Sequence, residues 1–373
     1  MAPKDADAPA TGDNAGGSDA AFDLDAPPGS DAPPDPDAES DPPRVTVIGA
    51  AAVDEWYAVS NLPKPDGGAY ATEVETAAGG VGANVAVGLD RLGRDVGLVS
   101  RVGDDEDGRQ ARSWLAATGV DTSRIAVGDD PTTRSVVLRA PDGERAIVTA
   151  GESFRELDPD PSVLGSALRS EVVFLTAYTP DRVAQRVLDR LVGMEPSDRP
   201  AVVFDLSGPV SELAGRGTEP VTIHGYAHRA DLFVAGGVAA PAYFGGPEAA
   251  VDRLRRIRTR AVGPAVLTHG ADGMTVIADG GATNVDAFDV DAVDTTGAGD
   301  AFLAGLIDRW VLGTPRTGTD PERPRSALVD AVRFAAAVAG INCTERFTQP
   351  GLPTREAVRA FLAERGVYPA GEG

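Results

Sequence analysis

Residues 291–310 read DAVDTTGAGDAFLAGLIDRW and join three patterns. Phe288, Val290 and Ala292 alternate with polar residues at the start of this region, which predicts a β-strand. The glycine-rich turn DTTGAGD follows. The apolar residues after the turn fall on one face of a predicted helix that ends near GTP: Phe302, Leu303, Leu306, Ile307 and Trp310. The region therefore predicts a strand, a turn and a helix in succession.

The turn has the features of an anion site. Gly297 and Gly299 allow successive backbone amides to point at one place, and the start of a helix adds the positive end of its dipole. Asp294 or Thr296 is expected to cap the helix, so Asp300 is a second acid beside this anion hole, where it is costly unless it acts as a base. We predict that the amides of residues 297–299 (Gly297, Ala298 and Gly299) hold a transferring phosphoryl group while Asp300 takes a proton from the attacking hydroxyl. The alternative is an ordinary glycine-rich helix start, and the turn lacks the Gly-Lys-Ser/Thr of a Walker loop.

A second glycine-rich turn precedes a helix at residues 77–93, AAGGVGANVAVGLDRLG. Asn84 in this segment both donates and accepts hydrogen bonds, which suits a ligand with many hydroxyl groups. The alternative is that Asn84 only caps the helix. The glycine spacing does not match the dinucleotide-binding pattern G-x-G-x-x-G. Asp54, just after the first strand, is a further polar residue at the end of a strand.

The chain alternates between short apolar runs and helical patterns. After a buried strand at residues 45–48, such runs occur at 95–103, 171–178, 201–208, 230–237 and 264–270. This alternation predicts a parallel sheet covered by helices on both faces, with ligands at the carboxyl ends of the strands. Two segments without helical period, residues 55–79 and 132–152, predict β-hairpins that protrude from the sheet as a lid.

Charge separates a tail from the rest of the chain. The 373 residues carry a formal charge of −23, and residues 1–43 contribute −10 of it, with eleven acids against Lys4. We predict that this tail is disordered, because it has little apolar surface to bury. The acidic balance argues against nucleic acid or an anionic membrane as a partner. No apolar run approaches the roughly 20 residues that span a bilayer, and Cys343 is the only cysteine, so we expect a cytoplasmic protein.

Several segments together resemble the ribokinase family of carbohydrate kinases, also called the PfkB family. GGVGANVAVGLDRLG and DTTGAGDAFLAGL are similar to its two signatures, and VGDDEDG, DGERAIV, LTHGADG and GLPTREAV follow the family order. The resemblance covers residues 44–368 and implies a three-layer α/β sandwich with a mainly parallel central sheet and a small β lid. It implies transfer of the terminal phosphoryl group of a nucleotide, with Mg²⁺ and often a monovalent cation such as K⁺. We expect ATP as the donor, and ADP and GTP are the alternatives.

The resemblance also implies roles for individual residues. Asp300 would be the catalytic base beside the amides of residues 297–299. The acceptor, a sugar, sugar phosphate, keto-deoxy sugar acid or nucleoside, would contact Asp54, Gly80 and Asn84. The nucleotide would lie along Thr268, Gly270 and Gly273, with Asp294 and the TQPGLP loop near the monovalent cation. A homodimer through the lid is a further expectation.

The chain lacks one motif of the family, and it has arginines on the second hairpin whose role is open. The family's Asn-x-x-Glu motif, which helps to place Mg²⁺, falls on Gly236 and Ala239 in this chain. We predict Asp205, at the end of a strand, as the substitute carboxylate. On the second hairpin we predict that Arg134, if it points inward, clamps a phosphate already present on the acceptor; the alternative is that Arg134, Arg139 and Arg145 only solvate the lid. The missing motif also leaves open a ligand-binding or regulatory protein of the same fold.

The excess of acids generates a prediction about salt. We interpret it as adaptation to a salt-rich cytoplasm, and the alternative is an ordinary acidic enzyme with an acidic tail. Screening of the repulsion between carboxylates should then raise the melting temperature as KCl is increased from dilute buffer to molar concentrations. Thermal unfolding followed at several KCl concentrations measures this. Full stability in dilute buffer, without further gain in salt, would contradict the interpretation.

Overall fold

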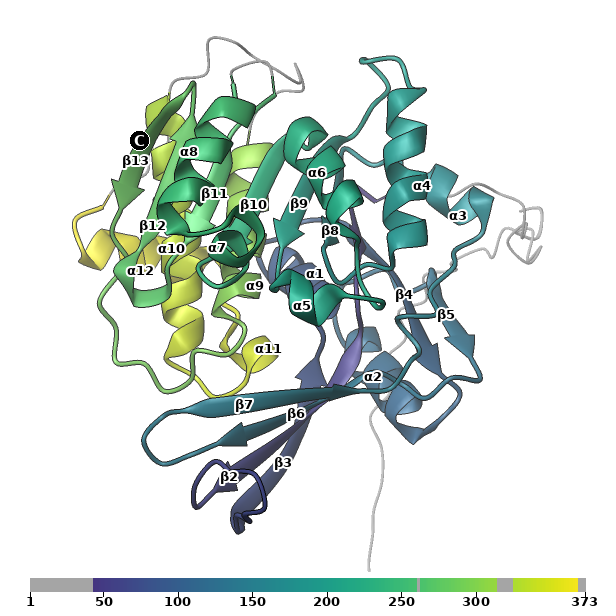
Figure 1. Cartoon of the computed structure of the whole chain (residues 1–373), viewed down its shortest axis with the longest axis vertical. Coiled ribbons are helices and arrows are strands. Elements are labelled where there is room, and N and C mark those ends of the chain that lie inside the picture. Colours follow the sequence, from purple (N-terminus) through teal and green to yellow (C-terminus); the bar gives the residue numbers. More distant parts are fainter. Residues whose placement is uncertain (1–42, 260–261, 314–324, 368–373) are drawn as a thin grey trace, which may run out of the picture. The chain divides into compact units, whose positions relative to one another are not determined.

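A nine-stranded sheet forms the centre of the computed structural model, which describes residues 43–259, 262–313 and 325–367. The predicted acidic tail lies outside the described residues except for Pro43. The strand order is β13-β12-β11-β10-β9-β8-β1-β4-β5 (Figure 1). The strands span Val45–Ile48 (β1), Val96–Gly103 (β4), Ile125–Gly128 (β5), Val172–Thr176 (β8), Ala201–Leu206 (β9), Leu232–Gly236 (β10), Ala265–Thr268 (β11), Met274–Ala278 (β12) and Gly281–Val285 (β13).

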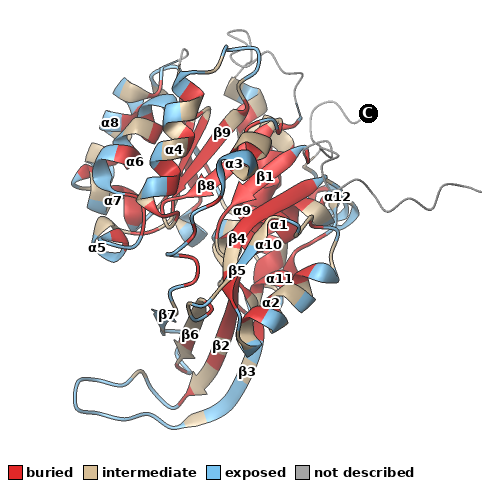
Figure 2. Ribbon diagram, turned by 90° about the vertical axis from the view of Figure 1, so that its right-hand side faces the viewer, coloured by how far each residue is buried: buried red, intermediate tan, exposed pale blue. Residues whose placement is uncertain are grey.

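The strands are apolar on both faces because helices cover both. Along β8, Val172 and Phe174 belong to one core, and Val173 and Leu175 belong to the other. The first core is closed by Val81–Arg91 (α1), Glu106–Ala116 (α2), Ala298–Leu306 (α9), Arg325–Cys343 (α10) and Arg355–Glu364 (α12). The second is closed by Pro161–Ala167 (α3), Asp181–Val192 (α4), Val210–Leu213 (α5), Pro220–Arg229 (α6), Ala239–Phe244 (α7) and Pro247–Ile257 (α8). Figure 2 shows the buried strands between helices with exposed outer faces. The fold is therefore the predicted three-layer α/β sandwich.

The strand order reverses beside β1. From β1 the parallel sheet continues to β4 and β5 on one side, and to β8, β9, β10 and β11 on the other. Ligands of open α/β sheets bind at the carboxyl ends of strands around such a point. The six strands predicted from apolar runs are all confirmed. The sequence analysis missed β5 and the antiparallel pair β12 and β13 at the sheet edge.

A second, four-stranded sheet carries the two predicted hairpins, and we call it the small sheet. Its order is β3-β2-β6-β7, from Ala52–Val59 (β2), Ala71–Gly79 (β3), Arg134–Arg139 (β6) and Arg145–Ala150 (β7). The hairpins are antiparallel, and the parallel pairing of β2 with β6 joins them. Trp56, Ala77 and Val137 form an apolar cluster on one face with Phe347, which precedes Thr348–Gly351 (α11). We call this face the inner face.

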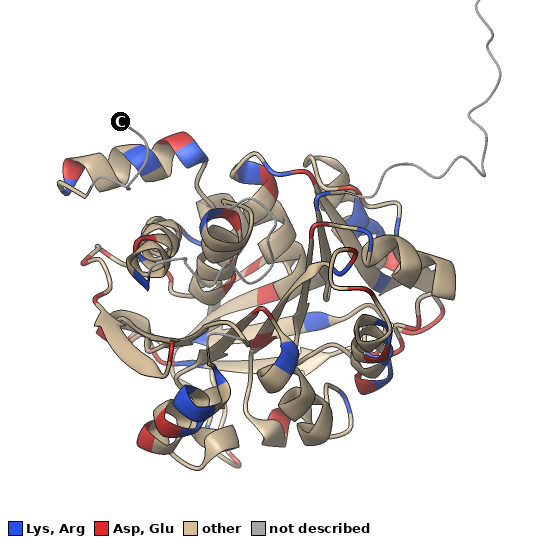
Figure 3. Ribbon diagram, turned by 90° about the horizontal axis from the view of Figure 1, so that it is seen from above, with Lys and Arg blue, Asp and Glu red and all other residues tan. Residues whose placement is uncertain are grey.

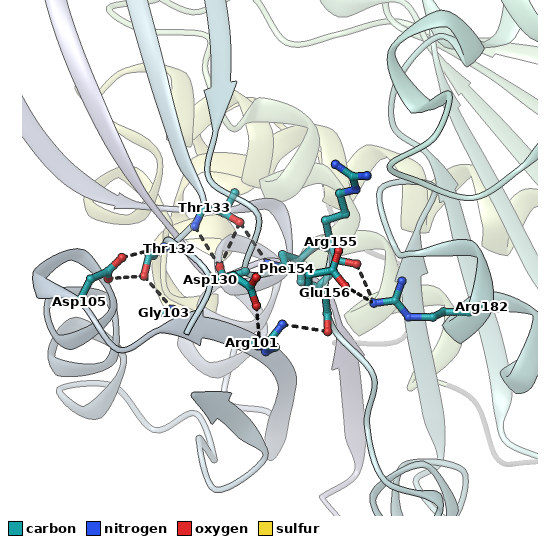
Figure 4. A network of polar contacts seen from close by, with 11 residues as sticks. Arg101, Gly103, Asp105, Asp130, Thr132, Thr133, Phe154, Arg155, Glu156 and Arg182 are labelled. Carbon is teal, nitrogen blue, oxygen red and sulfur yellow. Dashed lines mark hydrogen bonds and ion pairs between the residues drawn. The ribbon is translucent and has the colours of Figure 1, made fainter. Parts of the chain in front are cut away.

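The base of the second hairpin is held by a polar network (Figure 4). Asp105 accepts hydrogen bonds from the amide of Gly108, at the start of α2, and from the amide and hydroxyl of Thr132, each at 2.8 Å or less. Arg101 pairs with Asp130 at 2.7 Å and donates to the carbonyl of Glu156 at 3.0 Å. Both ends of the hairpin are thus tied to β4 and α2 of the sandwich.

Two observations bear on other predictions from the sequence. The strand predicted at Phe288, Val290 and Ala292 is wrong: residues 286–292 have no strand partner, because β13 already ends at Val285. Helix α10 has the length and apolarity to cross a membrane, with a mean hydropathy of 1.4, but 61% of that window is buried against the rest of the fold, as in a core helix. Charged residues of both signs lie on the helices and connections around the sandwich (Figure 3).

Candidate active site

Three acids of the predicted site influence one another electrostatically. Asp54 lies on β2, which follows β1, Asp205 lies near the end of β9, and Asp300 lies in the first turn of α9. The charges of Asp205 and Asp54 both raise the pKa of Asp300. The predicted base is therefore within electrostatic reach of one predicted acceptor-binding residue and of the predicted metal ligand.

Asp300 is a carboxylate with a pKa far above its usual range. Burial raises the pKa of Asp300 to about 7, and the charges of Asp205 and Asp54 add to this effect. The hydrogen bond from Asn84 works in the opposite direction, because it stabilises the charged form. A carboxylate with this pKa changes its protonation state near neutral pH, as a general base does.

The side chain of Asn84 orients Asp300. Its Nδ2 donates to Oδ2 of Asp300 at 2.8 Å, across 216 residues of sequence. Its own Oδ1 accepts from Nε2 of Gln349 at 3.1 Å, which fixes which end of the amide faces the acid. The sequence analysis did not single out Gln349; the only signal was its place in the TQPGLP loop. Asn84 thus links the N-termini of α1 and α9.

The turn before α9 has the geometry of an anion hole. Gly297 precedes the helix with φ 77°, a left-handed conformation that favours glycine, and a Cβ there would lie 2.1 Å from Thr348. A Cβ on Gly299 would meet no atom within 4 Å, so the backbone at this residue faces open space. The first amides of a helix have no partner within the helix. Here the amide of Ala298 donates to the carbonyl of Thr295 at 3.4 Å, outside the helix. Binding of an oxyanion by this turn stays a prediction.

Neither predicted cap of α9 forms. The residue at the cap position is Gly297, and no side chain bonds to the helix start. Asp294 instead accepts hydrogen bonds from the amide of Thr296 at 3.0 Å and from the amide of Phe347 at 3.1 Å. The capping prediction for Asp294 and Thr296 is therefore wrong, because both carboxylate oxygens hold two loops together. The proximity of Asp294 to a monovalent cation stays a prediction.

Asp54 and Gly80, which are predicted to contact the acceptor, lie in a buried part of the site. Burial raises the pKa of Asp54 to about 6, and a hydrogen bond from Ser135 opposes the rise. Its Oδ1 is buried and has no hydrogen-bond partner among the described residues. Gly80, with φ 91°, starts α1 next to Ala50, and a Cβ there would lie 2.5 Å from the Ala50 carbonyl oxygen. An unsatisfied buried oxygen of this kind favours a ligand hydroxyl.

The predicted nucleotide-binding residues lie at the end of β11, the neighbour of β10, and in the turn that follows it. Thr268 ends β11, and Gly270 and Gly273 flank the short 3-10 turn that follows, with φ 61° and 89°. Gly236, where the family motif has Asn, pairs with Thr268 in the sheet. A Cβ on Gly236 would have only the Thr268 hydroxyl near it, at 3.9 Å. The space of the missing side chain is therefore open.

Asp205 fits the role of a single carboxylate near Mg²⁺. Burial raises the pKa of Asp205 to about 7, and the hydroxyl of Ser207 donates to its Oδ2 at 2.5 Å. The described residues contain no cluster of three or more His, Cys, Asp and Glu side chains. Mg²⁺ usually takes one or two carboxylates and fills its other positions with water and phosphate oxygens, so one buried acid beside a phosphate site suffices. Which residue holds the ion stays a prediction.

Tyr178 is a buried residue near the predicted site that the sequence analysis did not single out. Burial, together with the charges of Glu212, Asp205 and Asp300, raises the pKa of Tyr178 to about 12. Its hydroxyl would lie 2.6 Å from a Cβ on Gly208, so Gly208 leaves room for it. Its position after β8, at the end of a parallel strand, was the available signal.

Arg134 is already occupied by acids. It pairs with Glu55 at 3.0 Å and Asp107 at 3.7 Å. Successive strand residues alternate between faces, and Val137 lies on the inner face, so Arg134 lies on the outer face. The condition for its predicted role, an inward side chain, is not met. Arg139 and Arg145 are the arginines of this hairpin that reach the loop before α9.

Comparison with known proteins agrees with this geometry. The sequence model described as pfkB family carbohydrate kinase matches residues 42–191 and 239–355. The match covers both glycine-rich turns. It leaves out residues 192–238, which contain β9, α5, α6 and β10. The chain therefore belongs to the pfkB family of carbohydrate kinases. Asp205 and Gly236 lie in the segment that the match leaves out.

The matches to individual relatives extend over nearly the whole length of each relative. The chain is 32% identical over 323 residues to an ATP-dependent ribose-1-phosphate kinase of Halopiger xanaduensis, covering 86% of this chain and 99% of the relative. It is 27% identical to a nucleoside kinase of Methanothermobacter thermautotrophicus over 340 residues, covering 86% and 96%. The Arabidopsis thaliana ribokinase complexed with ribose and ATP superposes with a TM-score of 0.69 at 22% identity, covering 86% of this chain and 99% of the ribokinase. The chain is a carbohydrate kinase of ribokinase-like fold.

The raised pKa of Asp300 predicts a stability gain in a variant. A group whose pKa is higher in the folded state binds its proton more tightly there, so its contribution to stability falls as pH rises from about 4 toward 7. The Asp300→Asn variant has no ionisable group at this position, so it avoids the cost of burying a charged carboxylate. We expect its free energy of unfolding to exceed that of the wild type by about 1–3 kcal/mol at pH 8 and by less at pH 5.

Urea unfolding at both pH values measures the difference. Asp289→Asn is the control, because Asp289 is exposed. An Asp300→Asn variant that is no more stable than the wild type at pH 8 would contradict the environment described for this acid.

Proposed function

We propose that this kinase transfers the terminal phosphoryl group of ATP to a hydroxyl of a sugar-like acceptor, with Asp300 as general base. The observation that carries the proposal is the placement of Asp300. A carboxylate with a pKa near 7 lies in the first turn of α9, beside the first backbone amides of that helix. Base and anion hole are thus within one turn of helix.

The protein supplies the base in a defined orientation. Asn84 occupies Oδ2 of Asp300, and no other described side chain bonds to the carboxylate, so Oδ1 is open to the acceptor. A base near its pKa at neutral pH combines the correct protonation state with a useful driving force for proton transfer. The proton of the attacking hydroxyl then passes to Oδ1.

The amides of residues 297–299 hold the transferring group. As the acceptor oxygen bonds to the γ-phosphorus, the bond from that phosphorus to the bridging oxygen breaks, and ADP leaves. Charge on the equatorial oxygens is stabilised by the amides and by the N-terminal end of the α9 dipole. Mg²⁺, when bound, neutralises phosphate charge, and we assign Asp205 as its protein ligand.

The acceptor contacts Asp54, Gly80 and Asn84 in this proposal. Asp54 offers an unsatisfied buried oxygen, and Gly80 allows the backbone to approach closely. The relatives are named for ribose 1-phosphate and nucleosides, and the ribokinase structure contains ribose and ATP. Two of these names include ATP, and ribose is part of ribose 1-phosphate and of ribonucleosides; on this support we propose a ribose-like acceptor and ATP for this chain.

The second candidate is a ligand-binding or regulatory protein of the same fold. Gly236 and Ala239 favour it, because they replace the usual metal-positioning pair. The raised pKa of Asp300 favours the enzyme, since binding alone does not require a base beside the anion hole.

Turnover of the Asp300→Asn variant separates the two candidates. The loss of a general base should lower kcat by about 10²–10⁴-fold, with little change in KM for ATP. For the wild type, kcat should rise with pH up to about 7 and then level off, because Asp300 must be deprotonated. Coupled ADP release, measured with Mg²⁺ and a panel of sugars, sugar phosphates and nucleosides at high KCl, tests both.

The control for this experiment is Asp289→Asn, which should behave as the wild type. Equal turnover in wild type and Asp300→Asn would exclude Asp300 as the base. No turnover in the wild type with any acceptor would favour the binding protein.

The role of Asp205 generates a separate prediction about magnesium. In Asp205→Asn the ion loses its carboxylate, so the Mg²⁺ concentration for half-maximal rate should rise about tenfold or more while ATP remains the donor. Titration of activity with MgCl₂ at fixed ATP measures the shift. An unchanged magnesium dependence would assign the ion to other ligands.

A further inference from the structure

Two arginines face each other on the inner face of the small sheet. Arg139 of β6 and Arg145 of β7 are direct partners in the antiparallel register. Directly opposite residues point to the same face, with Cβ atoms about 5 Å apart. Arg139 lies two residues after Val137, which belongs to the inner apolar cluster, so both arginines share that face.

Neither guanidinium has an acidic partner. Arg139 donates from Nη2 to the carbonyl of Val293 at 2.6 Å. Arg145 donates from Nη1 to the hydroxyl of Thr296 at 2.8 Å and, less closely, to that of Thr295 at 3.4 Å. No carboxylate in the described part of the chain forms an ion pair with either of them, in a protein with 57 acids and 34 basic residues. Like charges directly opposite in a sheet are destabilising, so this pair has a cost without a counter-ion.

The arginines line a hollow of about 160 Å³ between the small sheet and the loop before α9. Ligand pockets usually measure about 300–1,000 Å³, so this space suits one group of a larger ligand. Trp56 lines the same hollow, and its Nε1 is buried without a hydrogen-bond partner. Asp294 is the one acid in the lining, and both of its oxygens already accept backbone amides. The remaining side-chain groups are donors, which suit an anion.

The position of the hollow favours the acceptor over the nucleotide. Trp56 lies two residues after Asp54 on β2, so both side chains are on the inner face. Neither the residues proposed for the nucleotide nor Asp54 and Asp300 line the hollow, so Trp56 is the residue that connects it with the acceptor end of the site. An acceptor whose hydroxyl end lies between Asp54 and Asp300 would reach the arginines by extending along the inner face past Trp56.

We propose that Arg139 and Arg145 bind a phosphate group carried by the acceptor, so that the preferred substrates are sugar monophosphates with a free primary hydroxyl. This inference rests on the proposed function, whose acceptor class it narrows. The guanidinium groups exchange their present carbonyl and hydroxyl partners for phosphate oxygens, and planar forks of this kind bind phosphate in a bidentate manner.

The experiment compares acceptors that differ only in the phosphate. Ribose and ribose 1-phosphate form one pair, and fructose and fructose 1-phosphate form another. In the wild type we expect a higher kcat/KM for the phosphorylated member. In the double variant Arg139→Ala/Arg145→Ala, its KM should rise about tenfold per arginine, while kcat/KM for the neutral member stays unchanged.

Arg155→Ala is the matched control. It removes one arginine beyond the end of β7 whose side chain pairs with Glu152 on the surface. It should leave the ratio of the two acceptors unchanged. A wild type that prefers the neutral sugar would overturn the proposal. So would a double variant that loses both acceptors equally, since that result assigns the arginines to docking of the small sheet.

A binding measurement separates this inference from the proposed function. Calorimetric titration of the nucleotide-free protein with ribose 1-phosphate and with ribose requires no turnover. Tighter binding of ribose 1-phosphate that is lost in the double variant supports the arginine site even if no acceptor is phosphorylated. Normal turnover of neutral sugars, without any advantage of the phosphate in binding or rate, supports the kinase and refutes the arginine site.

Discussion

The candidate site depends on one electrostatic constraint: the charges of Asp54 and Asp205 act on the buried carboxylate of Asp300, and none of these acids has a basic partner among the described residues. Among the described residues, no arginine or histidine pairs with Asp54, Asp205 or Asp300, and burial raises the pKa of each. Neutral donors stand in for cations, namely Ser135, Ser207 and Asn84. Such donors hold the acids in place without neutralising them. The fold therefore keeps a region that disfavours added negative charge, and a phosphorylated nucleotide enters it only together with cations and the amide dipoles of α9.

Much of the sandwich was predictable because its signals are local. Parallel strands buried on both faces read as short apolar runs, and β8 shows this along Val172–Thr176. The glycine-rich turns were also readable, since a left-handed residue such as Gly297 needs glycine. The strand predicted near Phe288 failed for the opposite reason. Its alternating pattern is local, but a strand needs a neighbour, and β13 ends before it.

The sequence named candidate residues for the site but not the contacts between them. Asp54, Asn84 and Asp300 were identified because each lies at a strand or helix end, yet nothing in the sequence says that Asn84 bonds to Asp300 and Gln349. The arginines show the same limit. Alternation along β6 puts Arg134 and Arg139 on opposite faces, but only the packing of Val137 with Trp56 and Phe347 shows which face is inner, and only the register of β6 with β7 puts Arg145 opposite Arg139. Register is a tertiary property that a single hairpin sequence does not specify.

The connections of the small sheet have a mechanical consequence. Only residues 49–51 separate β1 from β2, and Gly80 alone separates β3 from α1. The second hairpin is tied at its base through Asp105 and Thr132. A displacement of the small sheet would therefore also displace Asp54 and the start of α1, which carries Asn84. Because Asn84 holds Oδ2 of Asp300, the position of the small sheet and the orientation of this carboxylate are coupled through one short covalent connection.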